Sequence, residues 1–332
     1  MHLREPATRT LVDVSAEWKS HERSWNSDAC VPEVDFTKEI GVSPTISLGD
    51  HKINLDEEAT DRLCSFYEIP RAFFNRLTND EKHFVMNARI QHTSGEVTVE
   101  YGHRGITDVR RPSQPRLEVE VFARIAHRIF PSTATVLNDW VTPDDLRLDV
   151  IGLLPMLGRN GAVYGGLRLT QNRKSNLAPT VSPILFHEDT TTIIEIPDPS
   201  LKIDARKVSI EKIAERLEAE ALRAEARTSS DISHLFSLGN TFIGGDRITR
   251  LHRIAAEHGL PVRPLADVTV DLSRTDEPTM FDLVVAIANA ANAPKIQDAG
   301  KRAVRTKLQA IAGAIITDEA ERCGACSAVL AA

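Results

Sequence analysis

Three groups of residues in this 332-residue chain could carry chemistry, and each predicts a different kind of site. Cys323 and Cys326 stand in a C-x-x-C spacing, which suits half of a structural zinc site or a thiol–disulfide switch. Three aspartates lie at the start of a strand-like run, where carboxylates could gather around a divalent metal: Asp144, Asp145 and Asp149. The third group is a concentration of arginine in the middle of the chain, which could contact phosphates.

The C-x-x-C pair supplies only two of the four ligands that a structural zinc site needs. His252 and His258 could complete the set, but their spacing on a helix turns them toward different faces. No strand-to-helix context of the thioredoxin kind surrounds the pair, which weighs against a redox motif. We therefore expect Cys323 and Cys326 to lie near the surface and to take no part in catalysis.

The three aspartates leave two interpretations open. A metal-dependent nucleic-acid enzyme would use them as ligands, but a nuclease normally adds a lysine at a fixed spacing, and none follows here. Asp144 and Asp145 also suit a turn or cap directly after Pro143. The chain carries no phosphate-binding loop, no G-x-S-x-G and no H-E-x-x-H. The H-E-D run at 187–189 lacks the downstream P-C-x-x-C of a zinc deaminase, so we expect no catalytic residues and no cofactor.

Arginine gives the one positive signal. Between Tyr101 and Asn176, eleven basic residues stand against seven acidic ones, although the whole chain has a net charge of −7. Ten of the eleven are arginine, and arginine with aromatic and amide neighbours suits a groove that follows a single-stranded backbone and stacks its bases. A solvated sheet face is the alternative. The predicted nucleic-acid-binding residues are Tyr101, Arg104, Arg110, Arg111, Arg159, Tyr164, Arg168, Arg173 and Lys174.

Arg168 is the strongest member of this predicted groove. In a strand, Arg168 shares one face with Thr170, while Leu167 and Leu169 take the other face, which we assign to the core. We therefore expect Arg168 to be exposed. Arg110 and Arg111 are adjacent, so only one of the pair can join a common groove.

The elements that would position these residues fall into three stretches: an N-terminal arm and helical segment at 1–94, an α+β core at 95–235 and a C-terminal helical segment at 236–332. In the first stretch, Asp56 begins a helix, Pro70 opens a second and Thr78 caps a third. In the last stretch, Thr279 and Asp282 form a capping pattern, and a further helix spans Ile296–Thr317.

The middle stretch changes from helical to strand periodicity. A strand at Glu96–Tyr101 and an amphipathic helix at Leu117–Ile129 precede a series of short aliphatic runs separated by turn residues. The runs are Ala134–Val141, Leu146–Leu154, Ala162–Thr170, Val181–Phe186 and Thr191–Ile196. Because parallel crossovers would need intervening helices, they predict an antiparallel sheet of three to six strands, in which Gly165 and Gly166 mark a bulge or close approach. A long helix with apolar residues from Val208 to Ala224 follows, which makes the fold class α+β.

Composition limits the setting. The chain is 42% hydrophobic and 26% charged, with neither an apolar signal segment nor a run long enough to span a membrane. Four cysteines make no disulfide framework in a chain of this length, and Cys30 and Cys64 are expected to be ordinary residues. We expect a cytoplasmic protein without a membrane partner.

Three segments resemble a known family. Leu55–Leu77, with its Ile69-Pro70-x-x-Phe73-x-x-Arg76-Leu77 pattern, resembles the phage- and plasmid-borne family catalogued as domain of unknown function nine-three-two. Val97–Arg111 and the run from Gly165 to Asn172 are similar to its later blocks. Where that family has an arginine-cysteine-asparagine-glycine segment, this chain has Leu185-Phe186-His187. The family has no established activity, so the resemblance implies chiefly a mobile-element setting, in the cytoplasm of a bacterial host.

A sheet with a long following helix is also similar in layout to the core of single-strand annealing recombinases of the RecT, Red-beta and Rad-fifty-two groups. Those proteins form rings or filaments and hold DNA in a basic groove without ATP. The local excess of arginine, the absence of catalytic motifs and the mobile-element resemblance together predict an ATP-independent protein that binds or anneals single-stranded DNA in recombination, as a homo-oligomer. The alternatives are the metal-dependent nucleic-acid enzyme and a phage interaction or anti-defence protein without DNA contact.

Overall fold

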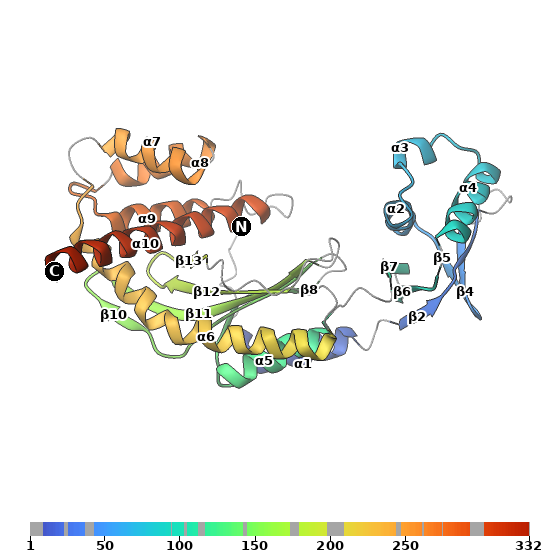
Figure 1. Cartoon of the computed structure of the whole chain (residues 1–332), viewed down its shortest axis with the longest axis horizontal. Helices are drawn as coiled ribbons and strands as arrows, with labels where there is room; N and C mark the ends of the chain where they lie inside the picture. The colour runs from blue at the N-terminus through green and yellow to red at the C-terminus, as the bar shows by residue number, and fades with distance from the viewer. Residues whose placement is uncertain are drawn as a thin grey trace, which may run out of the picture.

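A computed structural model describes residues 9–22, 26–36, 43–93, 95–102, 105–111, 117–141, 145–172, 179–197, 209–243, 247–260, 262–273, 275–292 and 302–331, with side chains in the last stretch for 304–320. The described chain forms a small and a large lobe, each with its own apolar core (Figure 1). The small lobe, residues 26–111, is inserted between two helices of the large lobe, because the chain on either side of it packs together in the large lobe.

The large lobe is built on one antiparallel sheet. Its strands run in the order β1 (Arg9–Thr10), β8 (Thr135–Val141), β9 (Asp145–Ile151), β11 (Gly161–Asn172), β12 (Thr180–His187) and β13 (Thr192–Glu195), and β10 (Met156–Gly158) pairs with the start of β11. Every pairing in this sheet is antiparallel. The aliphatic runs predicted this antiparallel sheet, and the α+β class of the fold is confirmed. The sheet has seven strands where three to six were predicted, because β1 and β10 extend it.

One face of the sheet is apolar because alternate residues of its strands are aliphatic. Leu146, Leu148 and Leu167 lie on this face and are at most 1% exposed. They pack against α1 (Leu11–Glu22), α5 (Val119–Ile129) and the predicted long helix, α6 (Ile210–Ser237). Figure 1 shows these three helices on one side of the sheet and α9 and α10 on the other.

Glycine lets α6 approach β11 closely. A Cβ at Gly165 would lie 2.8 Å from the side chain of Thr228 on α6, and a Cβ at Gly166 would lie 2.2 Å from the carbonyl oxygen of Val150. The predicted close approach at these two glycines is therefore confirmed, because any side chain there would separate packed elements.

The C-terminal part of the chain is helical. It comprises η1 (Leu238–Asn240), α7 (Arg247–His258), α8 (Val262–Ser273), α9 (Met280–Ala290) and α10 (Arg302–Ala331). A capping box between Thr279 and Asp282 begins α9, as predicted. Because α9 is apolar on nearly all sides, it is buried in a core with α8, α10 and β13. Among the described residues, every helix is too short or too polar to traverse a bilayer.

The small lobe combines two three-stranded sheets with three helices. One sheet contains β2 (Asn26–Cys30), β6 (Val97–Gly102) and β7 (Gly105–Arg110), and the other contains β3 (Glu33–Asp35), β4 (Thr45–Leu48) and β5 (His51–Asn54). The helices are α2 (Glu57–Phe66), α3 (Arg71–Phe74) and α4 (Asn79–His92). The side chains of Asp56 and Thr78 cap α2 and α4, as predicted.

The small lobe departs from the predicted organisation in two ways. The expected irregular arm contains β2 to β5, which are three to five residues long and so too short for an alternating pattern to predict strands. In addition, β6 pairs with β2 and lies in the same core as α2 and α4. A boundary at residue 94 would therefore separate β6 and β7 from the elements against which they pack.

Candidate functional site

The predicted nucleic-acid groove does not form as one surface. Among its described members, Tyr101, Arg110 and Arg111 belong to the small lobe. The other described members, Arg159, Tyr164 and Arg168, belong to the large lobe. Three members fall outside the described residues: Arg104, Arg173 and Lys174.

Arg168 is buried, so the prediction that it is exposed is wrong. Its residue is 1% exposed. Its Nε donates to Asp149 Oδ1 at 2.8 Å, its Nη2 donates to Gln309 Oε1 at 2.8 Å, and its Nη1 pairs with Glu195. Leu167 and Leu169 do face the core, but the opposite face of the sheet is covered where α10 brings Gln309 against it. The best single candidate for a phosphate contact is therefore a structural residue.

A second arginine joins the same buried network. The Nη2 of Arg147 donates to Asp149 Oδ2 at 2.6 Å, and its guanidinium lies 4.8 Å from the ring centre of Trp140. Asn138 Nδ2 donates to the same carboxylate oxygen at 2.9 Å. Asp149 therefore stands between two guanidiniums and cannot bind a cation without losing them.

The aspartates proposed as metal ligands are therefore not available together to bind a metal ion. Asp149 is 0% exposed, and Asp145 accepts a hydrogen bond from Trp140 Nε1 at 3.1 Å. Asp144 lies outside the described residues. Within the described part of the chain, no three His, Cys, Asp or Glu side chains are grouped so as to hold a metal ion.

Burial dominates the electrostatics of this network. It raises the pKa of Asp149 to about 6, against the lowering effect of Arg147 and of the hydrogen bond from Asn138. Burial likewise raises the pKa of Glu195, which Arg147 and a hydrogen bond with Ser182 oppose. Both carboxyl groups therefore depend on the guanidiniums to stay ionised near neutral pH.

The remaining large-lobe candidates lie apart from Arg168. Tyr164 is half-buried, with its ring centre 6.3 Å from that of Phe186, and burial raises the pKa of its hydroxyl. Arg159 is exposed on the turn between β10 and β11. Because Arg168 is buried, these residues do not form a continuous basic surface with it.

In the small lobe, Arg110 is also compensated. It lies 3.0 Å from a carboxylate oxygen of Glu100 and 3.7 Å from one of Asp108. Arg111 is exposed at the end of β7. Opposite charges on β6 and β7 therefore neutralise the arginine that sequence reasoning placed in the groove.

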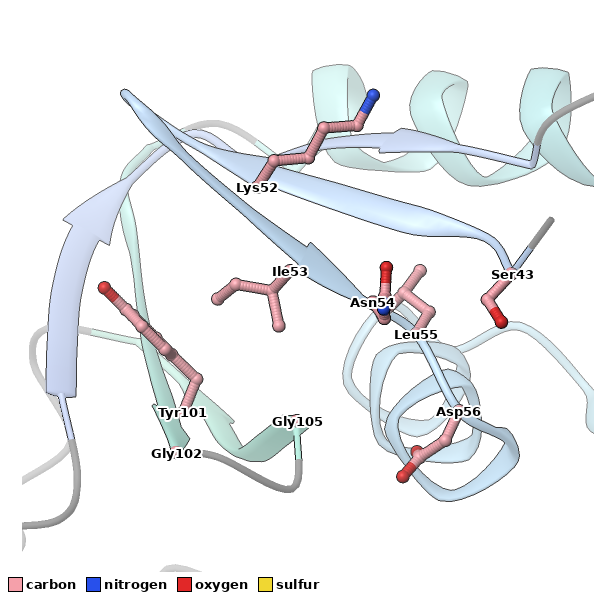
Figure 2. A pocket seen from close by; sticks show the side chains of 9 residues that line it. All are labelled: Ser43, Lys52, Ile53, Asn54, Leu55, Asp56, Tyr101, Gly102 and Gly105. Atoms are coloured by element: carbon pink, nitrogen blue, oxygen red, sulfur yellow. The ribbon is translucent and has the colours of Figure 1, made fainter.

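The small lobe contains a cavity of about 440 Å³ beside Tyr101, which we call the Tyr101 cavity (Figure 2). It is lined by Ser43, Lys52, Ile53, Asn54, Leu55, Asp56, Tyr101, Gly102 and Gly105. Figure 2 shows Tyr101 on one side and Leu55 and Asp56 on the other, with Ile53 between them. The two glycines flank positions 103 and 104, which are His and Arg in the sequence. The cavity lies between β5 and the turn that joins β6 to β7.

Tyr101 is held rigidly at this cavity. Its hydroxyl donates to Asp28 Oδ2 at 2.8 Å, and burial raises the pKa of that hydroxyl. Asp56 is also committed, because its Oδ1 accepts from the Ala59 amide at the start of α2. Lys52 and Asn54 are exposed polar residues of the lining, and Figure 2 shows the Lys52 ammonium pointing away from Tyr101 and Ile53. Sequence reasoning found Tyr101 but missed Lys52 and Asn54, because they lie in a short polar strand without a motif.

The two cysteines whose side chains are described form no disulfide bond. Cys30 is half-buried and Cys64 is buried, both are free, and burial raises the pKa of both thiols. Cys323 and Cys326 lie in α10, where their side chains are outside the described residues. His258 of α7 lies 3.6 Å from Asp318 of α10.

Comparison with known proteins adds no relative: no family model, no curated protein and no solved structure matches this chain. The resemblances noted from the sequence therefore stay predictions, and the function has to be argued from the geometry of the lobes.

Proposed function

We propose that the protein binds single-stranded nucleic acid through its small lobe, with one nucleotide seated in the Tyr101 cavity. The observation that supports this is that the aromatic residue Tyr101 and the exposed Lys52 line one cavity. Tyr101 and Ile53 offer an apolar surface to a base, and Asn54 can bond to the base edge. Lys52 supplies a positive charge for a neighbouring phosphate. A volume of about 440 Å³ lies within the usual range for small-ligand pockets.

The charge of the small lobe limits the kind of binding. Residues 26–111 contain ten lysines and arginines and fifteen aspartates and glutamates, so the lobe has a net charge of −5. Such a lobe does not attract a polyanion from a distance. Binding must then come from a few local contacts, with a shallow salt dependence of about −0.7 in log K per log salt for each phosphate contact.

Lys52→Ala tests this proposal. We expect it to weaken binding of a fluorescein-labelled oligothymidylate about tenfold, because a hydrogen bond to a charged group is worth roughly 1.5–3 kcal/mol. The salt slope should become shallower by about 0.7. Fluorescence anisotropy at several salt concentrations measures both quantities. Since Lys52 is exposed, the variant should fold normally.

Lys212→Ala is the matched control, because Lys212 is an exposed lysine near the start of α6 in the large lobe. It should bind like the unmodified protein. Equal losses in the two variants, stronger binding to duplex than to single strand, or no binding at low salt would each contradict the proposal. Strand annealing, assembly into a ring or filament, and a phage or plasmid setting remain predictions from the sequence.

A further inference from the structure

A second cavity lies in the large lobe, between two sheet turns and the helical C-terminal part. Its volume is about 560 Å³, and we call it the α9 cavity. The turn after β10 contributes Arg159, the turn after β12 contributes Asp189, and α8 and α9 supply the rest of the wall. Leu272, Phe281 and Val285 also line the cavity, each with only a small part of its side chain exposed.

His187 fixes the two turns relative to each other. His187 is 4% exposed. Its Nε2 donates to the carbonyl oxygen of Asn160 at 2.8 Å, because a carbonyl oxygen can only accept a hydrogen bond. Its Nδ1 lies 2.8 Å from Thr190 Oγ1, and its ring meets the ring of Phe281 at 5.5 Å, nearly edge-on. With both ring nitrogens satisfied, His187 is part of the wall and has no free nitrogen for catalysis.

The backbone at Gly161 makes room for Asp189. Gly161 has a φ of +104°, and a Cβ there would lie 2.3 Å from Asp189 Oδ2. The positive φ favours glycine at position 161, and the exposed carboxylate of Asp189 lies where a Cβ would stand, against the turn after β10.

The charged groups of the cavity differ in how they are compensated. Asp282 is committed to the α9 capping box, where it accepts from the amide of Thr279 at 2.7 Å, and Asp271 has an interaction of its own. By contrast, Arg159 and Asp189 make neither an ion pair nor a side-chain hydrogen bond within the described part of the chain. One carboxylate and one guanidinium therefore remain available at the same cavity.

We propose that the α9 cavity binds a small zwitterion of the amino-acid type. Its ammonium group would lie against Asp189 and its carboxylate against Arg159, since guanidinium and carboxylate pair through parallel hydrogen bonds. An apolar side chain would cover Leu272 and Val285. The volume of about 560 Å³ lies within the usual range for small-molecule sites.

Three compounds of matched shape test this proposal on the full chain: phenylalanine, 2-phenylethylamine, which lacks the carboxylate, and 3-phenylpropionate, which lacks the ammonium group. Thermal shift with the twenty amino acids at a few millimolar comes first, followed by calorimetry with the three compounds. We expect an apolar amino acid to raise the melting temperature. We expect each analogue to bind at least about tenfold more weakly than phenylalanine, because each leaves either Arg159 or Asp189 without its partner.

Two variants assign the charges. Asp189→Asn should weaken binding of phenylalanine and 2-phenylethylamine about tenfold and leave 3-phenylpropionate unaffected. Arg159→Gln should weaken binding of phenylalanine and 3-phenylpropionate about tenfold and leave 2-phenylethylamine unaffected. Glu188→Gln, an exposed neighbour that does not line the cavity, is the control and should bind like the unmodified protein. If no amino acid shifts the melting temperature, if 2-phenylethylamine binds as well as phenylalanine, or if both variants affect all ligands equally, the proposal is overturned.

Discussion

Arg168→Met will cost about 3–5 kcal/mol of unfolding free energy at pH 7.5, the range found when one partner of a buried ion pair is removed. The guanidinium of Arg168 bonds both to Asp149, which is fully buried, and to Glu195. Without it, Asp149, which is fully buried, and Glu195, whose side chain is 14% exposed, are left with the single guanidinium of Arg147. Urea unfolding followed by circular dichroism measures the loss.

The loss should shrink at pH 5. Burial already raises the pKa of Asp149 to about 6 and raises that of Glu195. When the pKa of a group is higher in the folded state than in the unfolded state, the free energy of unfolding increases as the pH falls through the folded-state pKa. In Arg168→Met the two pKa values rise further, so protonation removes the uncompensated charge in the folded protein. The difference between the variant and the unmodified protein should therefore be smaller at pH 5 than at pH 7.5.

Two further variants separate charge balance from packing. Arg168→Met combined with Glu195→Gln restores equal numbers of buried charges and should recover part of the loss. Arg128→Met breaks an ion pair in which the arginine side chain is 61% exposed, and should cost less than about 1 kcal/mol. If Arg168→Met costs no more than Arg128→Met, or if its effect grows on acidification, the buried network does not stabilise the fold in this way.

Gly313→Ala will destabilise the protein by about 3 kcal/mol, although alanine is normally the better residue within a helix by about 1 kcal/mol. A Cβ at position 313 would lie 1.9 Å from the carbonyl oxygen of Glu195 and 2.9 Å from the Cα of Ile196. Both atoms belong to the backbone at the end of β13 and cannot move aside as a flexible side chain would. The whole of α10 would have to shift away from the sheet.

Limited proteolysis alongside urea unfolding tests this prediction. We expect α10 of Gly313→Ala to be cleaved before the sheet, since α10 is the element that the new methyl group displaces. Gly152→Ala is the control, because a Cβ there would meet only the carbonyl oxygen of Gly165 at an ordinary 3.5 Å, and it should change the stability by less than about 1 kcal/mol. Gly313→Ala behaving like Gly152→Ala would mean that α10 does not pack against β13 at this distance.

The two predictions are connected through α10. Gln309, one turn before Gly313, accepts from Arg168, and Thr306 lies 3.3 Å from Arg147. Displacing the helix would remove these partners and admit water to the ion pairs. The buried network and the helix packing therefore stabilise the same interface.

Sequence alone determined the elements whose signals are local. Aliphatic runs separated by turn residues predicted five strands of the antiparallel sheet, and capping patterns placed the starts of α2, α4 and α9. These predictions hold because strand alternation and helix capping depend on residues a few positions apart. The strands from β2 to β5 are too short for such a pattern to stand out. Of these, β2 pairs with the distant β6, whereas β3, β4 and β5 pair with one another.

Charge location was the part that sequence could not settle. Periodicity correctly separated Arg168 from Leu167 and Leu169, but it reports which residues share a face of a strand, not what covers that face. The covering residue, Gln309, lies 141 positions further along the chain, and no local pattern refers to it. For the same reason, Lys52 and Tyr101 line one cavity, and Arg159 and Asp189 line another, only once the chain has folded. Tertiary packing decided which charges are buried and which remain available to a ligand, because burial depends on contacts between segments that are distant in sequence.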